Sequence, residues 1–265
     1  MTVGFNYLGR LGQLGNQMFQ YAATLGSARH RGDTFAIPKH NEVYDNGSKR
    51  LKIELFDCFD IKPDKIGYLK TDYVLAEKGF EYDESILNAK QESDFTLYGF
   101  FQTGKYFKHC EDEVREQFTF KQEIIDECKQ IVEDYFDNPI ALHIRRGDYL
   151  TNPNHCPQSN DYYEEALSKF ESDRQVVIFS DDPDWCMKQE LFSDDRFIVS
   201  ESAGPYHDLY MMTQCSDFII ANSSFSWWGA WLANVGKVIA PKKWFGEGNK
   251  HLNTKDVYCE NWEVL

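Results

Sequence analysis

The sequence lacks the features of a membrane-spanning, disulfide-stabilised or nucleic-acid-binding protein. No window approaches the roughly 20 apolar residues of a membrane span, and the N-terminus does not have the basic-then-apolar layout of a signal peptide. The seven cysteines are scattered, with no C-x-x-C pair and no histidine clustered at metal spacing. The net charge of −15 disfavours a nucleic-acid partner. We therefore expect a cytoplasmic protein with reduced thiols and no bound metal.

The sequence has enough hydrophobic residues to form a large core. The chain has 265 residues, of which 42% are hydrophobic and 15% aromatic, and this fits one large domain or two small ones. The first half opens with a strand pattern at 2–7, a glycine-rich loop, a helix pattern at 17–29 and a strand at 34–37. The topology of residues 40–95 is not legible, apart from a polar turn at 46–48.

The second half is more regular. An aromatic strand is expected at 95–102, and a charged amphipathic helix at 122–136 ends before a proline. We place a domain boundary at this helix. The N-terminal lobe is then 1–125 and the C-terminal lobe 126–265. Beyond it, strands and helices alternate, with strands at 140–145, 176–180, 196–199, 217–221 and 237–240 and helices at 161–170, 183–191, 206–214 and 225–235. Such alternation predicts an α/β fold with a doubly wound parallel sheet.

The first of these strands ends in an unusual group of charged residues. Residues 138–149 read NPIALHIRRGDY, so that a short apolar strand leads into two arginines, a glycine and an aspartate. If the strand is extended, His143 and Arg145 share one face and can meet one ligand, whereas Arg146 points to the other face and needs a structural partner such as Asp148. A surface ion-pair cluster is the alternative. Gly147, which allows close approach of the backbone, favours a phosphate site.

Ligands of doubly wound sheets bind beyond the carboxyl ends of the strands, so the other strand ends are candidate sites as well. They carry further polar residues. Asp182 followed by Pro183 has the pattern of a helix N-cap with proline at the first helical position. Asp181 is open to a functional role. Asp208 lies near the start of a helix, where the helix dipole favours a carboxylate whatever its function.

Two serines stand between the fourth strand and its helix. Ser223 and Ser224 would place hydroxyl groups and free backbone N–H groups at a helix N-terminus, which is an anion site, although one serine would suffice as a cap. Three tryptophans of this helix are expected to pack it onto the sheet, namely Trp227, Trp228 and Trp231.

The N-terminal loop has the form G-x-x-G-x-x-G. It matches neither the G-x-G-x-x-G of dinucleotide folds nor the P-loop, but it shares their strand–loop–helix context. Asn16 and Gln17 add amide groups at the helix entrance. The chain has no nucleophile elbow and no H-E-x-x-H motif, so nucleophilic hydrolysis has no support.

Taken together, these motifs resemble the α-1,2-fucosyltransferases of glycosyltransferase family 11. The segments that carry the resemblance, in order and spacing across nearly the whole chain, are GQLGNQMFQYA at 12–22, HIRRGDY at 143–149, FSDD at 179–182 and ANSSFSWWGAW at 221–231. The resemblance implies a GT-B-like fold of two Rossmann-like lobes. It also implies GDP-β-L-fucose as donor, no metal or other cofactor, inversion at the fucose anomeric carbon, and transfer to the 2-hydroxyl of a terminal galactose.

The resemblance also implies roles for individual residues. His143 would lie at the guanosine end of GDP-fucose, Arg145 at its β-phosphate, and Asp208 at the guanine. The remaining residues expected at the donor are Ser223, Ser224, Asn16, Gln17 and Asp181, and those expected in catalysis are Arg145, Asn16 and Asp148. Gln13 departs from relatives that carry Gly or Arg there, and Arg10 is the nearby residue that could compensate.

The sequence leaves three points open. The general base is not assigned, and Asp148, His155 and Asp161 are the candidates. The acceptor is a galactose-terminated oligosaccharide or a lipid-linked glycan, and the latter would bring the protein to the inner face of the membrane. The alternatives are a fucosyltransferase of another linkage, a transferase of another GDP-sugar, and a catalytically silent GDP-sugar-binding module.

Overall fold

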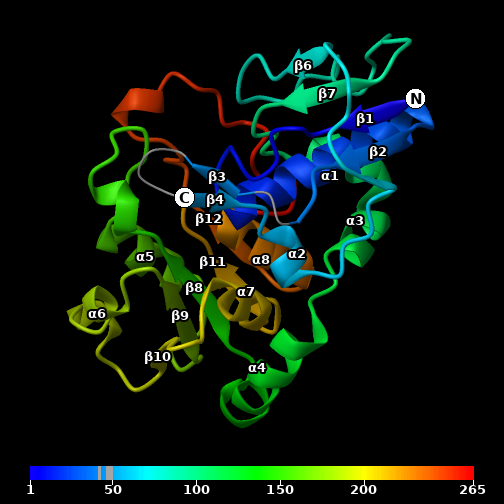
Figure 1. The fold of residues 1–265 in the computed structure, drawn as a ribbon. Coiled ribbons are helices and arrows are strands. Elements are labelled where there is room, and N and C mark those ends of the chain that lie inside the picture. The colour runs from blue at the N-terminus through cyan, green and yellow to red at the C-terminus, as the bar shows by residue number, and fades with distance from the viewer. Residues whose placement is uncertain (41–42, 46–49) are drawn as a thin grey trace. The chain divides into compact units, whose positions relative to one another are not determined.

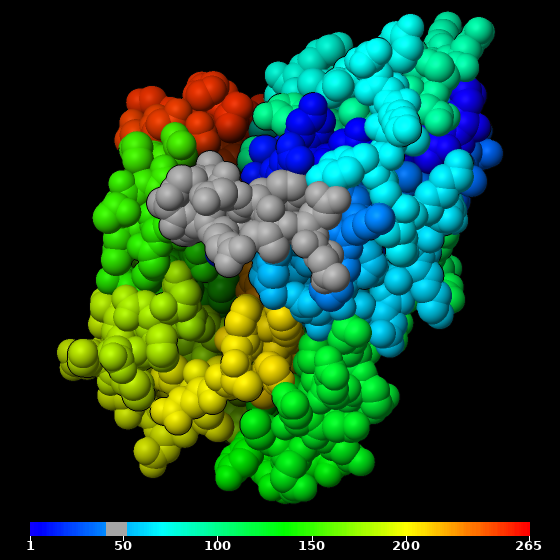
Figure 2. Space-filling view, in the orientation of Figure 1, coloured from blue at the N-terminus to red at the C-terminus, as the bar shows by residue number. Residues whose placement is uncertain are grey.

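The computed structural model describes residues 1–40, 43–45 and 50–265 (Figure 1). The polar turn expected at 46–48 lies outside these residues. The chain divides into two compact units, unit 1 with Met1–Lys121 and Asn253–Val257 and unit 2 with Gln122–Leu252 and Tyr258–Leu265. The division falls after residue 121, not after 125, because helix α4 (Gln122–Tyr135) packs on α7 (Pro205–Thr213). Figure 2 shows green α4 beside yellow α7.

Unit 1 is built on a parallel sheet with the strand order β5-β2-β1-β7-β6. Its strands are β1 (Thr2–Gly4), β2 (Thr34–Ile37), β5 (Lys65–Ile66), β6 (Val74–Ala76) and β7 (Phe95–Tyr98). Two further strands, β3 (Val43–Asp45) and β4 (Arg50–Lys52), pair antiparallel. The helices are α1 (Leu14–Arg31), α2 (Leu55–Cys58) and α3 (Glu111–Gln117), with 3₁₀ turns at Gly104–Tyr106 and Lys108–Cys110.

Helix α1 is longer than the predicted 17–29. It begins directly after the extended residue Gln13 and ends at Gly32, whose left-handed φ of 68° lets its N–H reach the last carbonyls. Gly26 lies inside the helix, and a Cβ there would overlap the Tyr106 carbonyl oxygen. The helix therefore approaches the Tyr106 backbone closely because Gly26 has no side chain at this contact.

Unit 2 contains the predicted doubly wound sheet, with all pairs parallel and the order β10-β9-β8-β11-β12-β13. The strands are β8 (Ile140–Ile144), β9 (Val176–Ser180), β10 (Phe197–Val199), β11 (Asp217–Ile219), β12 (Val238–Ala240) and β13 (Glu263–Val264). Besides α4 and α7, the helices are α5 (Asn160–Leu167), α6 (Pro183–Cys186) and α8 (Ser224–Ala233), with 3₁₀ turns at Gly147–Leu150, Glu190–Phe192 and Glu247–Asn249.

One predicted helix of the second half is wrong in its extent, and one strand was missed. The helix expected at 183–191 ends at Cys186, because Gln189 is extended (φ −83°, ψ 130°) and a separate 3₁₀ turn follows. The strand β13 was not predicted, since two residues carry too little pattern to be recognised. No helix in the described ranges is long and apolar enough to cross a membrane. No disulfide joins any of the seven cysteines, all of which lie in the described ranges.

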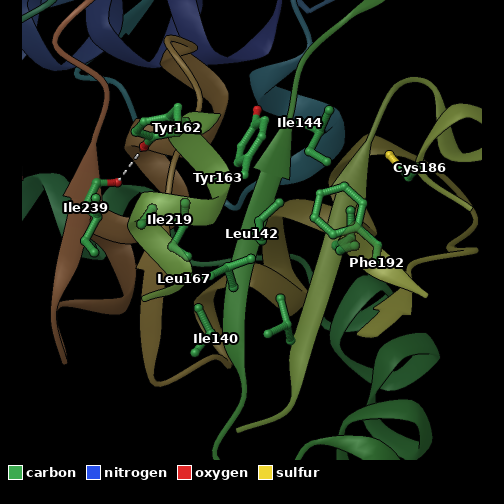
Figure 3. Packing of buried hydrophobic residues seen from close by; sticks show 13 residues of the cluster. Ile140, Leu142, Ile144, Tyr162, Tyr163, Leu167, Cys186, Phe192, Ile219 and Ile239 are labelled. Atoms are coloured by element: carbon green, nitrogen blue, oxygen red, sulfur yellow. Dashed lines mark hydrogen bonds between the residues drawn. The ribbon is translucent and has the colours of Figure 1, made fainter. Parts of the chain in front are cut away.

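The predicted alternation along β8 is confirmed in the core (Figure 3). Ile140, Leu142 and Ile144 point into a cluster with residues of α5, and each is at most 2% exposed. Tyr162 of α5 donates a hydrogen bond to the Ile239 carbonyl oxygen at 3.2 Å, which fixes α5 on this face of the sheet. The opposite face of β8 therefore presents His143, whose ring centroid lies 5.5 Å from that of Phe225 in α8.

Candidate functional site

The order of the unit 2 sheet defines a switch point between β8 and β11. From β8 the chain proceeds through β9 and β10 on one side, whereas β11 and β12 lie on the other side. Leu142 of β8 pairs with Ile219 of β11, so the carboxyl ends of these two strands are neighbours. Ligands of doubly wound folds bind outside the sheet at such a point. The residues that follow the two strands are therefore the first candidates for a site.

Arg145 follows β8 directly and is held by two carboxylates. Its Nη2 donates to Asp148 Oδ1 at 2.7 Å, and its Nη1 lies 3.2 Å from Asp181 Oδ2. The guanidinium also lies 5.5 Å from the centroid of the Tyr149 ring. The side chain is 26% exposed. The structure thus brings together three of the predicted site residues and presents an oriented cation to solvent.

Arg146 faces away from Arg145, as the alternation predicted. Its Nε donates to Asp182 Oδ2 at 3.1 Å, and its guanidinium stacks 3.8 Å from the centroid of the Trp185 ring. The predicted partner Asp148 is wrong. The 3₁₀ turn at Gly147–Leu150 reverses the chain directly after the two arginines, so that Asp148 lies beside Arg145, three residues before it.

Gly147 makes room for a carboxylate. A Cβ at this position would overlap Asp181 Oδ2, and the neighbouring Arg146 N–H donates to Asp181 Oδ1 at 2.8 Å. The space where a Cβ would lie at Gly147 therefore holds the Asp181 side chain, and the phosphate site expected at this turn stays a prediction. Asp181 links the end of β9 to the turn that follows β8.

His143 is the buried member of the site. The residue is 4% exposed, and burial together with the positive charge of Arg145 lowers the pKa of its imidazole to about 3. The ring is therefore neutral at physiological pH. Its Nδ1 is buried and has no hydrogen-bond partner within the described part of the chain. A buried nitrogen in this state is free to pair with a ligand.

The helix start after β11 carries the two predicted serines. Ser223 is the N-cap of α8, and its Oγ accepts a hydrogen bond from the Phe225 N–H at 3.3 Å, so the capping alternative describes it correctly. Ser224 is the first helical residue and is only partly buried. The three tryptophans of α8 pack into the core as expected, at 0, 0 and 6% exposure for Trp227, Trp228 and Trp231.

Asn222 was not recognised from the sequence. Its Nδ2 donates to the carbonyl oxygens of Cys156 (3.0 Å) and Trp244 (2.8 Å), and its Oδ1 accepts from Gln158 Nε2 at 2.8 Å. Its own carbonyl oxygen accepts a hydrogen bond from the Tyr149 hydroxyl at 3.0 Å. This buried amide joins the loops after β8, β11 and β12. The only sequence signal is an Asn between an apolar strand and a capping serine.

The remaining candidates of unit 2 are His155, Asp161 and Asp208. His155 stacks on Tyr149 with ring centroids 4.4 Å apart, and burial, with Arg145 acting in the same direction, lowers the pKa of His155. Asp161 lies in the first turn of α5. Asp208 lies in α7, beyond β10, where burial raises the pKa of its carboxyl group although the Ser200 hydroxyl donates to it at 2.7 Å.

The candidates of unit 1 lie in the first turn of α1, directly after the glycine loop. The amide of Gln17 is fully used within this unit, with Nε2 donating to the carbonyl oxygens of Gly12 (3.3 Å) and Lys52 (2.9 Å) and Oε1 accepting from the Glu54 N–H (2.8 Å). Asn16 Oδ1 accepts from Gln102 Nε2 at 2.6 Å. Gly12 has a φ of 89°, which favours glycine, and a Cβ there would overlap the Asn16 amide.

The structure also shows where Gln13 lies, the residue that departs from the family pattern, and where Arg10 lies, the residue that could compensate for it. Gln13 is exposed at the start of α1 and makes no capping hydrogen bond. Arg10 is exposed, and its Nη2 donates to the Tyr68 hydroxyl at 3.2 Å.

Comparison with known proteins decides the family. The model of "Glycosyl transferase family 11" matches residues 4–265. The chain belongs to glycosyltransferase family 11. Two relatives in Escherichia coli match nearly end to end: an α-1,2-colitosyltransferase, 30% identical over 95% of each chain, and the O-antigen biosynthesis glycosyltransferase WbnK, 29% identical over 92% of this chain and 96% of the relative. Galactoside α-(1,2)-fucosyltransferase 1 of Ateles belzebuth is 24% identical over 84% of this chain and 63% of its own.

Two solved structures have the same fold as this family 11 glycosyltransferase. NodZ α-1,6-fucosyltransferase soaked with GDP-fucose superposes with a TM-score of 0.55 at 14% identity, over 95% of this chain and 97% of its own. POFUT1 in complex with GDP also gives 0.55, at 12% identity, over 90% and 97%. The expected GT-B-like α/β fold is confirmed, and so is the expectation that the protein is a glycosyltransferase.

Proposed function

We propose that this family 11 glycosyltransferase transfers L-fucose from GDP-β-L-fucose to the 2-hydroxyl of a terminal galactose, with inversion and without a metal ion. The observation that carries the proposal is the position of Arg145 at the switch point of unit 2, beside the strand that leads into the start of α8. An arginine fork and a helix N-terminus are both suited to a diphosphate. The names of the relatives supply the sugar and the linkage.

Arg145 would stabilise the charge that develops on GDP. When the acceptor oxygen attacks the anomeric carbon, the fucose–phosphate bond breaks and its electron pair stays on the β-phosphate. Asp148 and Asp181 hold the guanidinium at 2.7 and 3.2 Å, so the fork is oriented before the donor arrives. Donors that are fixed in advance stabilise a transition state without reorganisation. Asp148 therefore acts in this scheme through Arg145, and we assign it no role as general base.

The helix start and His143 would bind the rest of the donor. Ser223 fixes the entry into α8 by capping it, and Ser224, the first residue of the helix, would lie toward the diphosphate at the positive end of the helix dipole. His143 stays neutral because of burial and the Arg145 charge, which leaves its ring nitrogen available to the nucleoside. Asp208 would pair with the N–H donors of guanine, since a carboxylate suits two adjacent donors.

The roles in unit 1 are more limited. Asn16, which is partly buried beside Gly12, would offer its amide to the phosphate or to the fucose. Gln17 uses both ends of its amide to shape the loop, so we assign it to positioning and not to donor contact. When the acceptor glycan is lipid-linked, the reaction would take place at the inner face of the membrane.

The test is an assay of transfer with product analysis. The protein is incubated with GDP-fucose and galactosides such as lactose or Gal-β-1,3-GalNAc, GDP release is followed, and the product linkage and anomeric configuration are determined by NMR. An α-1,2-linked fucoside that forms equally well with and without EDTA is expected. A β-linked product would contradict inversion, and loss of activity in EDTA that Mg²⁺ or Mn²⁺ restores would contradict metal independence.

A second donor is favoured by a specific observation. A relative at 30% identity over 95% of both chains is a colitosyltransferase, and colitose is fucose without its 3-hydroxyl. The same assay with GDP-colitose in place of GDP-fucose separates the two donors by kcat/KM. Binding of either donor without transfer or hydrolysis, across a broad acceptor panel, would instead indicate a silent GDP-sugar-binding module.

A further inference from the structure

We propose that the carboxyl edge of the unit 1 sheet binds the terminal galactoside of the acceptor through exposed aromatic rings. The surface, called here the aromatic edge, consists of Tyr7, Arg10, Tyr68, Tyr98 and Phe100. The inference rests on the proposed function, which supplies a galactoside as acceptor, and it adds the residues that would recognise this sugar.

The strand order brings these residues to one edge. Strands β1 and β7 are parallel neighbours, with Val3 paired to Phe95. Tyr98 ends β7 and Tyr7 follows β1, and their rings touch with centroids 4.9 Å apart at an interplanar angle of 80°. Tyr68 follows β5 at the same edge, and the turn after Tyr7 carries Arg10, whose guanidinium donates to the Tyr68 hydroxyl. Figure 1 shows β1 and β7 side by side.

The rings are exposed although they are large and mostly apolar. Tyr98 and Phe100 are each 41% exposed and Tyr68 is 42% exposed. Single exposed aromatic rings are common, but several at one sheet edge, with an arginine among them, form a surface suited to binding. Arg10 adds a charged donor beside the tyrosine hydroxyls.

The loop that carries Phe100 is held in a strained form. Phe101 has a φ of 54° and Gly99 a φ of 154°, and both values are unusual for residues with side chains. The Glu77 carboxylate accepts hydrogen bonds from the N–H groups of Phe100 (2.8 Å) and Phe101 (3.0 Å). A Cβ at position 99 would overlap the Glu77 side chain. Strain of this kind persists where the surroundings fix it, and it is concentrated at binding sites.

The same loop is tied to the glycine loop. Gln20 donates to the carbonyl oxygens of Leu11 (2.8 Å) and Gly99 (3.3 Å), and Gln102 donates to Asn16 at 2.6 Å. The residue assigned to the donor sugar in unit 1 is therefore fixed to the loop that presents Phe100. The predicted strand at 95–102 ends at Tyr98 because the chain turns here.

A pyranose fits this surface better than a lipid chain. Galactose has one face of C–H groups, which packs on an aromatic ring, and hydroxyl groups around its edge, which pair with tyrosine hydroxyls and an arginine. Rings with polar tips, set beside a cation, match a ligand that is apolar on one face and polar at its rim. A lipid chain would need a longer continuous apolar surface.

The experiment measures galactoside binding independently of turnover. The full chain is saturated with GDP, and the Kd of lactose is determined by saturation-transfer NMR for wild type, Tyr98→Ala, Phe100→Ala and Tyr98→Trp. Tyr73→Ala is the matched control, because Tyr73 is 58% exposed and precedes β6 at the opposite edge of the same sheet. The affinity for GDP, measured on the same samples, reports whether each variant is folded.

We expect Tyr98→Ala and Phe100→Ala each to weaken lactose binding about tenfold, with Tyr98→Trp and Tyr73→Ala close to wild type. Equal lactose affinity in all variants, an equal loss in Tyr73→Ala, or no lactose binding by wild type would overturn the inference. If lactose binding depends on Tyr98 but the wild-type protein forms no fucosylated product, the proposed function is contradicted, and the inference that the aromatic edge binds a galactoside is supported.

Discussion

Two strand–loop–helix junctions of this molecule have the same outline and different chemistry. The junction of unit 1 runs from β1 through the glycine loop into α1, and its amide side chains Gln17 and Gln20 bond to backbone groups of the loops around them. The junction of unit 2 runs from β11 into α8, next to the end of β8. There Arg145 is paired with carboxylates at the surface, and His143 keeps a ring nitrogen without a partner among the described residues.

The difference shows that a glycine-rich loop before a helix can be a structural device. Positive φ angles at Gly9 and Gly12 let the unit 1 loop turn sharply, and buried amides then satisfy the carbonyl oxygens that the turn exposes. In unit 2 the loops are shaped by Asn222, so the charged side chains are left for a ligand. We expect substitutions in the first junction to change stability and substitutions in the second to change catalysis.

Removal of the Arg145 guanidinium should have the largest effect. Arg145→Ala is expected to lower kcat for transfer by about 10²–10³-fold, because it removes a donor aimed at the leaving phosphate. Arg145→Lys should recover little, since lysine cannot reproduce the planar fork. The measurement is GDP release at saturating GDP-fucose and acceptor.

Arg174→Ala is the matched control for this substitution. Arg174 pairs with Asp217 at 2.9 Å on the amino edge of the same sheet, far along the strands from Arg145. Its kcat should stay within about twofold of wild type, as distant sites rarely couple. Near-normal turnover by Arg145→Ala would contradict the assignment of the phosphate to this residue.

Substitution of Gln17 should weaken folding more than donor binding. Gln17→Ala removes three part-buried hydrogen bonds, to the Gly12 and Lys52 carbonyl oxygens and from the Glu54 N–H, which should lower the free energy of unfolding by about 3 kcal/mol. Urea denaturation measures this change, and GDP affinity at low denaturant should be unaltered. The exposed neighbour provides the control, with Gln13→Ala expected to change stability by less than about 0.5 kcal/mol.

The neutral state of His143 predicts a pH dependence of stability. Its pKa is about 3 when folded, against about 6.5 in the unfolded chain, so the unfolded state takes up the proton first as the pH falls. Well above pH 6.5 the residue adds no pH dependence. From about pH 7.5 down to about pH 5, protonation of His143 in the unfolded chain should reduce the free energy of unfolding by about 2 kcal/mol.

Comparison with His143→Gln isolates this effect, because glutamine keeps a polar side chain at this position but does not titrate. Urea denaturation of both proteins at pH 7 and pH 5 gives the difference. Parallel pH profiles for the two proteins would show that folded His143 takes up its proton in the same pH range as the unfolded chain, which would contradict the neutral ring.

The smallest effect is expected at Asp182, which supports the site without facing a ligand. Asp182→Ala removes the N-cap of α6 and the partner of Arg146, and should lower the free energy of unfolding by about 1–2 kcal/mol. Asp184→Ala, two residues further in the first turn of α6, should cost about 0.5 kcal/mol or less. Thermal melts distinguish the two. A loss of transfer activity in Asp182→Ala larger than its loss of stability would place Asp182 at the donor.

The sequence predicted the elements of unit 2 because they repeat a simple pattern. Strand 176–180 and the alternation along β8 match the structure, since buried strands and amphipathic helices must follow their own periods. The Asp182 cap followed from the residue types alone. The pairing of Asp148 with Arg145, by contrast, depends on a 3₁₀ turn that no pattern in the sequence predicts.

What the sequence by itself determined was the doubly wound sheet, the separation of Arg145 from Arg146 and the set of polar residues at the strand ends. These follow from local periodicity, which is a property of the chain. Only the tertiary structure decided that Asp181 occupies the space beside Gly147, that Asn222 joins three loops and that the amide of Gln17 is used within its own unit. Such partners are far apart in the sequence, and hydrogen bonds between them arise only when folding brings the loops together.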